Sequence, residues 1–357
     1  MSKIAIDVQT TQGQKTGFGF YVSNLTRELL KIDKKNKYVL LRPDSQQDFS
    51  APQRWWWDQV TVPAKARSQK VDLLHQPAFS APVRYAGKTV VTVHDIIAVL
   101  FGKDIPFFSR QFFAHWMPYS YRYANKIICV SEHTKKDLVK YLHIDESKIV
   151  VIPEAAGEEY QPVRDKKKIA QVLNKYKIGK PFILHIGTLN PRKNLSFLID
   201  VFSKVRQTLP DIQLVITGKK GWYYENLFEL VEKLGLQKDV IFTGYIEDCE
   251  APVLYSAATV YAFPSLYEGF GLPPLEAMAC GTPVVASNMS SIPEVMGNAG
   301  ILLSPTDKIG WVSALQNVLS SQAEQKKLSD KSLARAKNFS WRQTAQKTIR
   351  IYEELLK

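Results

Sequence analysis

The sequence predicts an α/β protein made of two Rossmann-like, doubly wound domains that face a central cleft. Three observations support this prediction. A chain of 357 residues with 45% hydrophobic residues is long enough for two domains, each with its own core. Short Val- and Ile-rich runs alternate with amphipathic segments, as in parallel sheets covered by helices. A polar, lysine-rich stretch at 154–180 separates two sets of such runs.

The elements follow in chain order. The first domain is predicted to use strands at 3–8, 37–42, 71–76, 88–95, 126–131 and 148–153, with helices near 18–32, 107–123 and 132–142. The stretch 154–180 is predicted to be a linker followed by one helix. The second domain is predicted to use strands at 181–187, 212–218, 240–245, 260–265, 283–287 and 300–304. Residues from about 307 to 357 show helical spacing of apolar side chains.

Charge and composition limit the classes of function. The formal net charge is +13, and residues 1–150 hold 22 Lys and Arg against 13 Asp and Glu, so this part contributes +9. A basic half suits nucleic acid, an anionic membrane or a phosphorylated substrate. The three cysteines are far apart and outside metal-binding or disulfide spacings, so we expect buried thiols. The chain begins without a leader-like pattern and has no long apolar run, which predicts a soluble, cytoplasmic protein.

The stretch PSLYEGFGLPPLE at 264–276 places two glutamates around a stiff loop. Glu268 should lie on the loop after a strand, and Glu276 on the helix that follows. Gly269 and Gly271 allow the backbone to approach a ligand closely, and the two prolines stiffen the connection. Two carboxylates beside exposed amides suit the paired hydroxyls of a sugar. The alternative is a helix N-terminal acid stabilised only by the helix dipole.

A second candidate site is GTLNPRKNL at 187–195, which follows a predicted strand and precedes a helix. Arg192 and Lys193 would lie near the positive helix N-terminus. Both the cationic side chains and the helix N-terminus would attract an anion such as a diphosphate. The alternative is an ordinary solvated Arg-Lys pair.

The first domain offers two weaker signals. GFGFYV at 17–22 contains Gly17 and Gly19 at the start of a helix, but Val22 stands where a dinucleotide fingerprint needs its third glycine. This argues against a Rossmann dehydrogenase. His94 ends the strand KTVVTVHD and could bond a sugar hydroxyl in the cleft, although a strand-end histidine is often only structural.

Together these motifs resemble the large retaining glycosyltransferase family 4 of the GT-B fold, which includes bacterial mannosyltransferases of lipopolysaccharide and exopolysaccharide assembly. The resemblance spans nearly the whole chain. It rests on GFGFYV, VVTVHD, CVSEHTKKDL, VIPEAAGEEY, GTLNPRKNL, TGKKGWYYE and, most specifically, YEGFGLPPLEAMACGTPVVAS with its two glutamates eight positions apart. The resemblance implies an N-terminal acceptor-side domain at 1–160, a nucleotide-sugar-binding domain at 161–340, and a helix at 341–357 that packs back on the first domain.

The resemblance also implies residue roles. Glu268 would contact hydroxyls of the transferred sugar, and Glu276 the ribose of the nucleotide. Arg192 and Lys193 would neutralise the diphosphate, and His94 would contact the sugar beside its anomeric carbon. The other implied donor-binding residues are Gly17, Gly19, Thr188, Tyr245, Gly269, Phe270, Gly271 and Leu272.

The implied reaction moves a hexose with retention, without a metal or other cofactor. The chain contains no Asp-x-Asp triplet, in agreement with charge neutralisation by Arg192 and Lys193. Relatives often carry arginine after the glycine where this chain has Gly187 and Thr188, so the phosphate contact would rest on Arg192 and Lys193 alone.

The expected partners are a nucleotide-sugar donor and a saccharide or lipid-linked saccharide acceptor. GDP-mannose is the first choice of donor because the resemblance favours it, and a UDP-hexose is the second. The loop at 245–250, which should face the base, does not distinguish guanine from uracil. Three alternatives stay open: a nucleotide-sugar epimerase, a non-catalytic nucleotide-sugar-binding protein, and a nucleic-acid-binding protein. The last is suggested only by charge and leaves the paired glutamates unexplained, so no nucleic-acid partner is expected.

Two aromatic and basic segments, 54–58 and 107–123, have two interpretations. They could form a face that docks the protein peripherally on the inner, anionic surface of the cell membrane beside a lipid-linked acceptor. The favoured interpretation is a core helix with further side chains packed around it.

Overall fold

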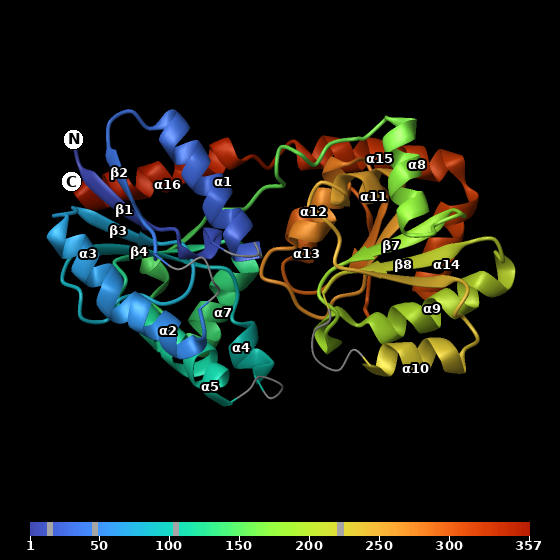
Figure 1. The fold of residues 1–357 in the computed structure, drawn as a ribbon, viewed down its shortest axis with the longest axis horizontal. Helices are drawn as coiled ribbons and strands as arrows, with labels where there is room; N and C mark the ends of the chain where they lie inside the picture. Colours follow the sequence, from blue (N-terminus) through green and yellow to red (C-terminus); the bar gives the residue numbers. More distant parts are fainter. Residues whose placement is uncertain (13–16, 45–48, 103–106, 220–224) are drawn as a thin grey trace. The chain divides into compact units, whose positions relative to one another are not determined.

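A computed structural model describes residues 1–12, 17–44, 49–102, 107–219 and 225–357. The chain forms two compact units (Figure 1). The first consists of Met1–Ala155 and Ser340–Lys357, and the second of Ala156–Phe339. The predicted divisions were at 160 and 340. Residues 220–224 of the motif TGKKGWYYE lie outside the described residues.

The first unit contains a six-stranded parallel sheet in the order β2-β1-β3-β4-β5-β6. Its strands are β1 (Lys3–Asp7), β2 (Lys37–Leu41), β3 (Leu73–Gln76), β4 (Lys88–Val93), β5 (Lys126–Cys129) and β6 (Ile149–Val151). All six predicted strands are confirmed, each slightly shorter than predicted. Helices cover both faces of the sheet, so the strands are runs of β-branched and leucine residues instead of alternating polar and apolar ones.

The helices of the first unit divide between the two faces. The α-helices are α1 (Gly17–Ile32), α2 (Ala51–Trp56), α3 (Val62–Ser68), α4 (Ile97–Leu100), α5 (Phe107–Arg110), α6 (Met117–Ser120), α7 (Glu132–Leu142) and α16 (Trp341–Leu356). Short 3₁₀ helices span Gln9–Thr11, Tyr121–Tyr123 and Glu146–Lys148, and π-helical turns span Trp57–Thr61 and Gln111–Trp116. Helices α1 and α16 pack together (Figure 1). On this face Tyr352 of α16 hydrogen bonds His75 of β3 at 2.5 Å.

The second unit contains a six-stranded parallel sheet in the order β12-β11-β10-β7-β8-β9. Its strands are β7 (Phe182–Ile186), β8 (Gln213–Thr217), β9 (Val240–Gly244), β10 (Val260–Phe263), β11 (Val284–Ser287) and β12 (Ile301–Leu303), as predicted apart from the strand ends. Every residue of β8, β10 and β11 is buried, which agrees with a sheet covered on both faces.

Helices cover both faces of the second sheet. They are α8 (Lys166–Lys175), α9 (Leu195–Thr208), α10 (Glu225–Lys233), α11 (Ala251–Ala257), α12 (Leu272–Ala279), α13 (Ile292–Met296), α14 (Lys308–Ser320) and α15 (Gln322–Ala336), with a 3₁₀ turn at Pro191–Lys193. Apolar side chains of α9, α10 and α14 form one core with the strands, and Trp311 of α14 lies at its centre with no exposed surface. Helices α11 and α12 lie across the sheet from α9 and α10 (Figure 1).

Three predictions need correction. The segment 107–123 is helical but not a single α-helix, because a π-helical turn interrupts it at Gln111–Trp116. The aromatic run 54–58 lies in a helical segment from Ala51 to Ser68 that was not predicted, since Pro52 and Pro63 concealed the helical spacing. Cys249 is exposed on the loop before α11, whereas Cys129 and Cys280 are buried as expected.

Among the residues that the structure describes, none of the helices combines the length and the apolar character needed to cross a bilayer.

Candidate functional site

The predicted cations of the second unit lie at the carboxyl end of β7. The chain leaves β7 at Ile186, forms the 3₁₀ turn Pro191–Lys193, and enters α9 at Leu195. Asn194, between the turn and the helix, has a left-handed backbone (φ 57°), a conformation that asparagine tolerates better than most residues. This turn directs both cationic side chains back toward β10, and Lys193 is only 6% exposed.

Glu268 meets both cations. Its Oε1 atom lies 2.6 Å from Nη1 of Arg192 and 2.7 Å from Nζ of Lys193. The Ser265 hydroxyl donates a third hydrogen bond to the same oxygen, at 2.5 Å. The Lys193 ammonium also lies 4.8 Å from the ring centre of Phe263 at the end of β10. We call Arg192, Lys193, Ser265 and Glu268 the cation cluster.

The cation cluster carries a net charge of +1. Burial of Glu268 by itself would raise the pKa of its carboxyl group, but the charges of Lys193 and Arg192 and the hydrogen bonds from Lys193 and Ser265 lower the pKa to about 2. Glu268 is therefore ionised at any physiological pH. Two cations and one anion leave one uncompensated positive charge in a largely buried place, which suits an anionic ligand such as a phosphate.

Serine side chains fix the loop that carries Glu268. The Glu268 amide donates to Oγ of Ser290 at 2.8 Å, and Oγ of Ser291 donates to the carbonyl oxygen of Phe270 at 2.6 Å. Gly271 has φ 110°, a backbone conformation that residues with a Cβ rarely adopt. It allows the loop to turn directly into α12, whose first turn contains Pro273 and Pro274 as predicted.

The second glutamate lies on α12 beside the cluster. Tyr255 donates to Oε2 of Glu276 at 3.2 Å, and Tyr160 also hydrogen bonds this carboxylate. The buried hydroxyl of Tyr261 is influenced by the charges of both Glu276 and Glu268, which, together with burial, raise its pKa well above the usual value. The two acids therefore lie close to the same tyrosine, one on each side of the turn from loop to helix.

The remaining residues of this unit that were predicted to bind the donor differ in their exposure. Thr188 is exposed on the loop after β7, and Tyr245 is 44% exposed after β9, with its ring 5.3 Å from Nζ of Lys219. Gly269 and Phe270 are buried, and the Phe270 ring packs edge-on against Phe339 at 5.9 Å. Leu272 is half-buried and opens α12.

A matched pair of cations occurs at the opposite edge of the same sheet. Asp239, which precedes β9 at its amino end, is 3% exposed and pairs with Arg206 at 2.7 Å and Lys180 at 3.6 Å. This second cluster repeats the arrangement of an Arg and a Lys around one buried carboxylate, and Asp211 adds a second acid 3.7 Å from Nζ of Lys180. It lies at the amino end of the strands, whereas ligands of parallel α/β sheets bind at the carboxyl ends. Substitutions in this second cluster can therefore serve as controls for substitutions in the cation cluster.

In the first unit, His94 follows β4 and both of its ring nitrogens face protein oxygens. Nδ1 lies 2.7 Å from Oε1 of Glu154, and Nε2 lies 3.0 Å from the carbonyl oxygen of Pro77. The rings of Tyr21 and Phe18 pack edge-on against the imidazole at 4.6 and 4.9 Å. A contact between His94 and a sugar hydroxyl would require one of these hydrogen bonds to be exchanged.

The two predicted glycines lie close by on α1. Gly17 begins the helix, is exposed, and has open space where a side chain would extend. Gly19 is buried one half-turn later, beside the rings that pack on His94.

Glu154 controls the charge of His94. Burial favours the neutral imidazole, but the hydrogen bond and the charge of Glu154, together with the Pro77 carbonyl and the charge of Asp95, raise the pKa of His94 above its usual 6.5. A raised folded-state pKa means that the pair stabilises the fold below pH 6.5, and that this stabilisation is lost as the pH rises through the folded-state value.

We therefore expect Glu154→Gln to lower the pKa of His94, because the amide carries no negative charge and burial then dominates. An NMR titration of the histidine Cε1–H resonances checks this shift. An unchanged His94 curve would show that Glu154 does not determine its charge.

Sequence analysis missed three residues that complete these contacts. Ser265 was within the motif PSLYEGFG, but a serine next to a strand end has no distinctive spacing. Glu154 and Tyr160 both lie in VIPEAAGEEY, which resembles the family but gives no indication of their partners. Only the fold brings Glu154 to His94, 60 positions away, and Tyr160 to Glu276.

Comparison with known proteins shows the family and the fold. Residues 165–335 match the model for glycosyl transferases group 1, and residues 21–156 match the model for glycosyltransferase family 4. O-antigen chain mannosyltransferase B of Escherichia coli is 33% identical over 291 residues, which cover 81% of this chain and 76% of that protein. O-antigen chain mannosyltransferase RfbU of Salmonella typhimurium is 31% identical over 64% of this chain and 60% of its own length. For the serotype-specific mannosyltransferase WbdA of Escherichia coli, 32% identical over 75% of this chain, the match spans only 34% of the relative.

Solved structures share the fold over the whole chain. Sucrose-phosphate synthase from Thermosynechococcus elongatus aligns with a TM-score of 0.77 and 21% identity over 99% of both chains. Anabaena HepE, solved in complex with UDP-glucose, aligns with a TM-score of 0.76 and 17% identity over 99% of this chain and 100% of that chain.

Two parallel sheets, a buried cation cluster at the carboxyl end of one of them, and these matches define a glycosyltransferase of the GT-B fold. The chain belongs to glycosyltransferase family 4, among the group 1 glycosyl transferases, with O-antigen mannosyltransferases as relatives.

Proposed function

We propose that this glycosyltransferase moves mannose from GDP-mannose to a saccharide or lipid-linked saccharide acceptor during cell-surface polysaccharide assembly, with retention and without a divalent ion. The observation that supports it is the cation cluster, in which Arg192 and Lys193 converge on one carboxylate oxygen of Glu268. A UDP-hexose is the second candidate donor.

The cluster is suited to exchange partners when a donor binds. A sugar nucleotide carries two negative charges on its diphosphate, and Arg192 and Lys193 can turn from Glu268 to these oxygens over a short distance. Glu268, released from part of this pairing, would then accept hydrogen bonds from hydroxyls of the transferred sugar. Glu276 would accept bonds from the ribose hydroxyls in place of the tyrosine hydroxyls that it now binds.

The same cations would stabilise the leaving group. As the bond between the anomeric carbon and the phosphate oxygen breaks, negative charge grows on the nucleoside diphosphate, where Arg192 and Lys193 already stand. The acceptor oxygen would form its bond to the anomeric carbon on the same face, and the departing phosphate oxygen would take its proton. In this scheme Glu268 holds the hydroxyls of the transferred sugar, and the attacking group is the acceptor oxygen.

The choice of mannose rests on relatives. E. coli O-antigen chain mannosyltransferase B and S. typhimurium RfbU are mannosyltransferases by name, at 33% and 31% identity. UDP-glucose belongs in the test because HepE, which shares the fold, was solved with it.

The test is a donor panel in EDTA. The purified protein is mixed with GDP-mannose, UDP-glucose, UDP-galactose or UDP-N-acetylglucosamine, and thermal shift and release of nucleoside diphosphate are measured. We expect GDP-mannose alone to stabilise the protein and to be hydrolysed slowly, and the product formed with a mannoside acceptor to keep the α configuration by NMR.

Other outcomes identify the alternatives. An epimerised sugar nucleotide formed without acceptor would indicate an epimerase, and binding without turnover would indicate a non-catalytic binding protein. Loss of activity in EDTA that returns with Mg²⁺ would overturn the metal-independent mechanism.

A further inference from the structure

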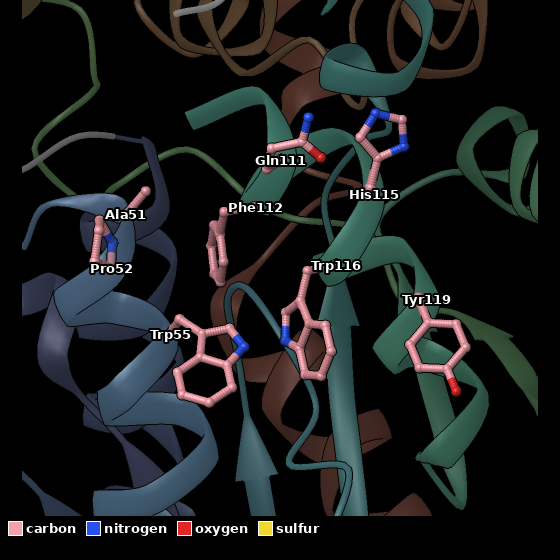
Figure 2. Close-up of a pocket in the computed structure, with 8 residues that line it drawn as sticks. All are labelled: Ala51, Pro52, Trp55, Gln111, Phe112, His115, Trp116 and Tyr119. Carbon is pink, nitrogen blue, oxygen red and sulfur yellow. The ribbon is translucent and has the colours of Figure 1, made fainter. Parts of the chain in front are cut away.

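An aromatic pocket of about 610 Å³ lies in the first unit, between the segments 51–56 and 111–119 (Figure 2). We call it the tryptophan pocket. Its principal lining residues are Trp55, Gln111, Phe112, His115, Trp116 and Tyr119. The volume is within the range of small-molecule sites. None of the residues proposed above to bind the donor lines it.

The rings of the pocket are set at angles to one another. Trp55 and Trp116 have ring centres 5.7 Å apart and planes inclined at 59°, and Tyr119 lies 6.0 Å from Trp116 (Figure 2). Trp116 ends the π-helical turn Gln111–Trp116, and the opposite wall continues into the π-helical turn Trp57–Thr61. Such turns are rare and occur mostly at functional sites, because they re-aim side chains that a regular α-helix would direct elsewhere.

The chemistry of the lining indicates a neutral, hydroxyl-bearing ligand. Among the described residues, none of those that line the pocket is an Asp, Glu, Lys or Arg, although residues 1–150 carry a charge of +9. The indole Nε1–H of Trp116 is buried and has no hydrogen-bond acceptor within the described residues. Gln111 and His115 add polar atoms at the upper rim (Figure 2). A buried donor without an acceptor costs free energy, and a ligand oxygen could recover it only if the indole ring turned toward the pocket.

Sugars fit this combination better than lipid does. The face of a pyranose ring presents C–H groups that pack on aromatic rings, while its hydroxyls reach polar groups at the edges. A lipid tail would leave the Trp116 N–H and the polar rim unpaired, and an anionic headgroup would find no cation in the lining. The pocket wall therefore combines aromatic rings with polar groups at its rim, as the binding of a neutral saccharide requires.

A row of aromatic rings joins the pocket to His94. Phe18 packs on His94 at 4.9 Å and on Phe79 at 5.2 Å. Phe79 lies 6.1 Å from Phe113, which in turn lies 4.9 Å from Phe112 in the pocket wall. Phe18, Phe79 and Phe113 are all partly exposed. The row thus offers a continuous partly apolar path, several ring widths long, between His94 and the pocket.

We propose that the tryptophan pocket binds a neutral hexopyranose ring of the acceptor chain, several sugars away from the ring that receives the new residue. The inference rests on the proposed function, since it assumes a saccharide acceptor whose reacting end lies near His94. It goes further by assigning a chain-holding subsite that would make longer acceptors bind better than short ones.

The first test measures binding without any nucleotide. Tryptophan fluorescence is titrated with an α-linked mannose hexamer and with methyl α-mannoside. We expect the hexamer to bind more tightly, and Trp55→Ala to weaken hexamer binding about tenfold, as expected for loss of one packed ring. Trp55 is 37% exposed, which limits the damage to the fold. Gln111 is exposed, and Gln111→Ala should weaken hexamer binding less than Trp55→Ala does. The control is Tyr141→Ala, which removes an exposed aromatic side chain of α7 and should leave hexamer binding unchanged.

The second test compares acceptors in the transfer reaction. In the wild type, KM should fall as the acceptor grows from one to six sugars, and in Trp55→Ala this advantage of length should disappear. Equal hexamer binding by the wild type and by Trp55→Ala and Gln111→Ala would overturn the proposal. So would fluorescence changes with vesicles of anionic phospholipid but not with the hexamer, which would indicate membrane docking.

The two proposals fail separately. If GDP-mannose is the wrong donor, hexamer binding in the absence of nucleotide is unaffected. If the pocket is not a sugar site, GDP-mannose is still turned over with short acceptors.

Discussion

Replacing Lys193 with methionine should reduce kcat/KM for the sugar-nucleotide donor by about 10²–10³-fold, the usual loss when one preorganised electrostatic group is removed. Methionine retains most of the buried stem, so the change mainly removes charge. The cation cluster falls from +1 to zero, and the leaving diphosphate loses one of its two cations. Steady-state kinetics with donor at saturating acceptor measure the loss.

The matched control is Lys180→Met. Lys180 takes part in the Asp239 cluster, which also places an Arg and a Lys around one buried carboxylate but lies at the amino end of the sheet. This variant should keep wild-type kcat/KM. If both variants lose activity equally, the effect is a general one on the unit and the cation cluster is not the diphosphate site.

Replacing Glu268 with glutamine should separate nucleotide binding from sugar transfer. The change raises the charge of the cation cluster from +1 to +2 and frees Arg192 and Lys193 from their shared anion. We therefore expect GDP to bind several-fold more tightly, because the unlike charges attract more strongly. We expect kcat to fall by about 10²–10³-fold, because the carboxylate that would hold the sugar is lost. Calorimetry with GDP and turnover of GDP-mannose give the two values.

Asp239→Asn is the control for this variant, since it removes a buried carboxylate from an Arg and Lys pair remote from the carboxyl edge. GDP affinity should not change in it. Weaker GDP binding in Glu268→Gln would contradict the assignment, because it would show that the carboxylate organises the cations instead of competing with the diphosphate for them.

The sequence alone predicted the twelve strands and the position of Arg192 and Lys193 at the end of one of them. Buried parallel strands are continuous apolar runs, and Arg192 and Lys193 follow one of them directly, so local order alone places them. The contact between Glu268 and both cations was not predicted. It joins positions 75 apart, and its geometry depends on the 3₁₀ turn and on Ser265, neither of which has a sequence signal.

The tryptophan pocket shows a second limit. The segments 54–58 and 107–123 were identified as unusual from their composition, and neither interpretation of them included a cavity. Helical spacing cannot foresee two π-helical turns, because one inserted residue per turn moves every later side chain around the axis. The same turns separate Trp57, which is 5% exposed in the core, from Trp56, which is 59% exposed.

The return of α16 to the first unit determines the order in which this protein can be completed on the ribosome. His75 and Tyr21 of the first unit contact Tyr352 and Trp341 of α16, which is synthesised after residues 156–339. At 5–20 residues per second, this intervening stretch takes on the order of 10–40 s to translate. During that time the side of α1 that packs on α16 lacks this partner, whereas residues 156–339 of the second unit are all synthesised by its end. The unit that begins first is therefore finished second, and its uncovered helix is where a nascent-chain chaperone would act.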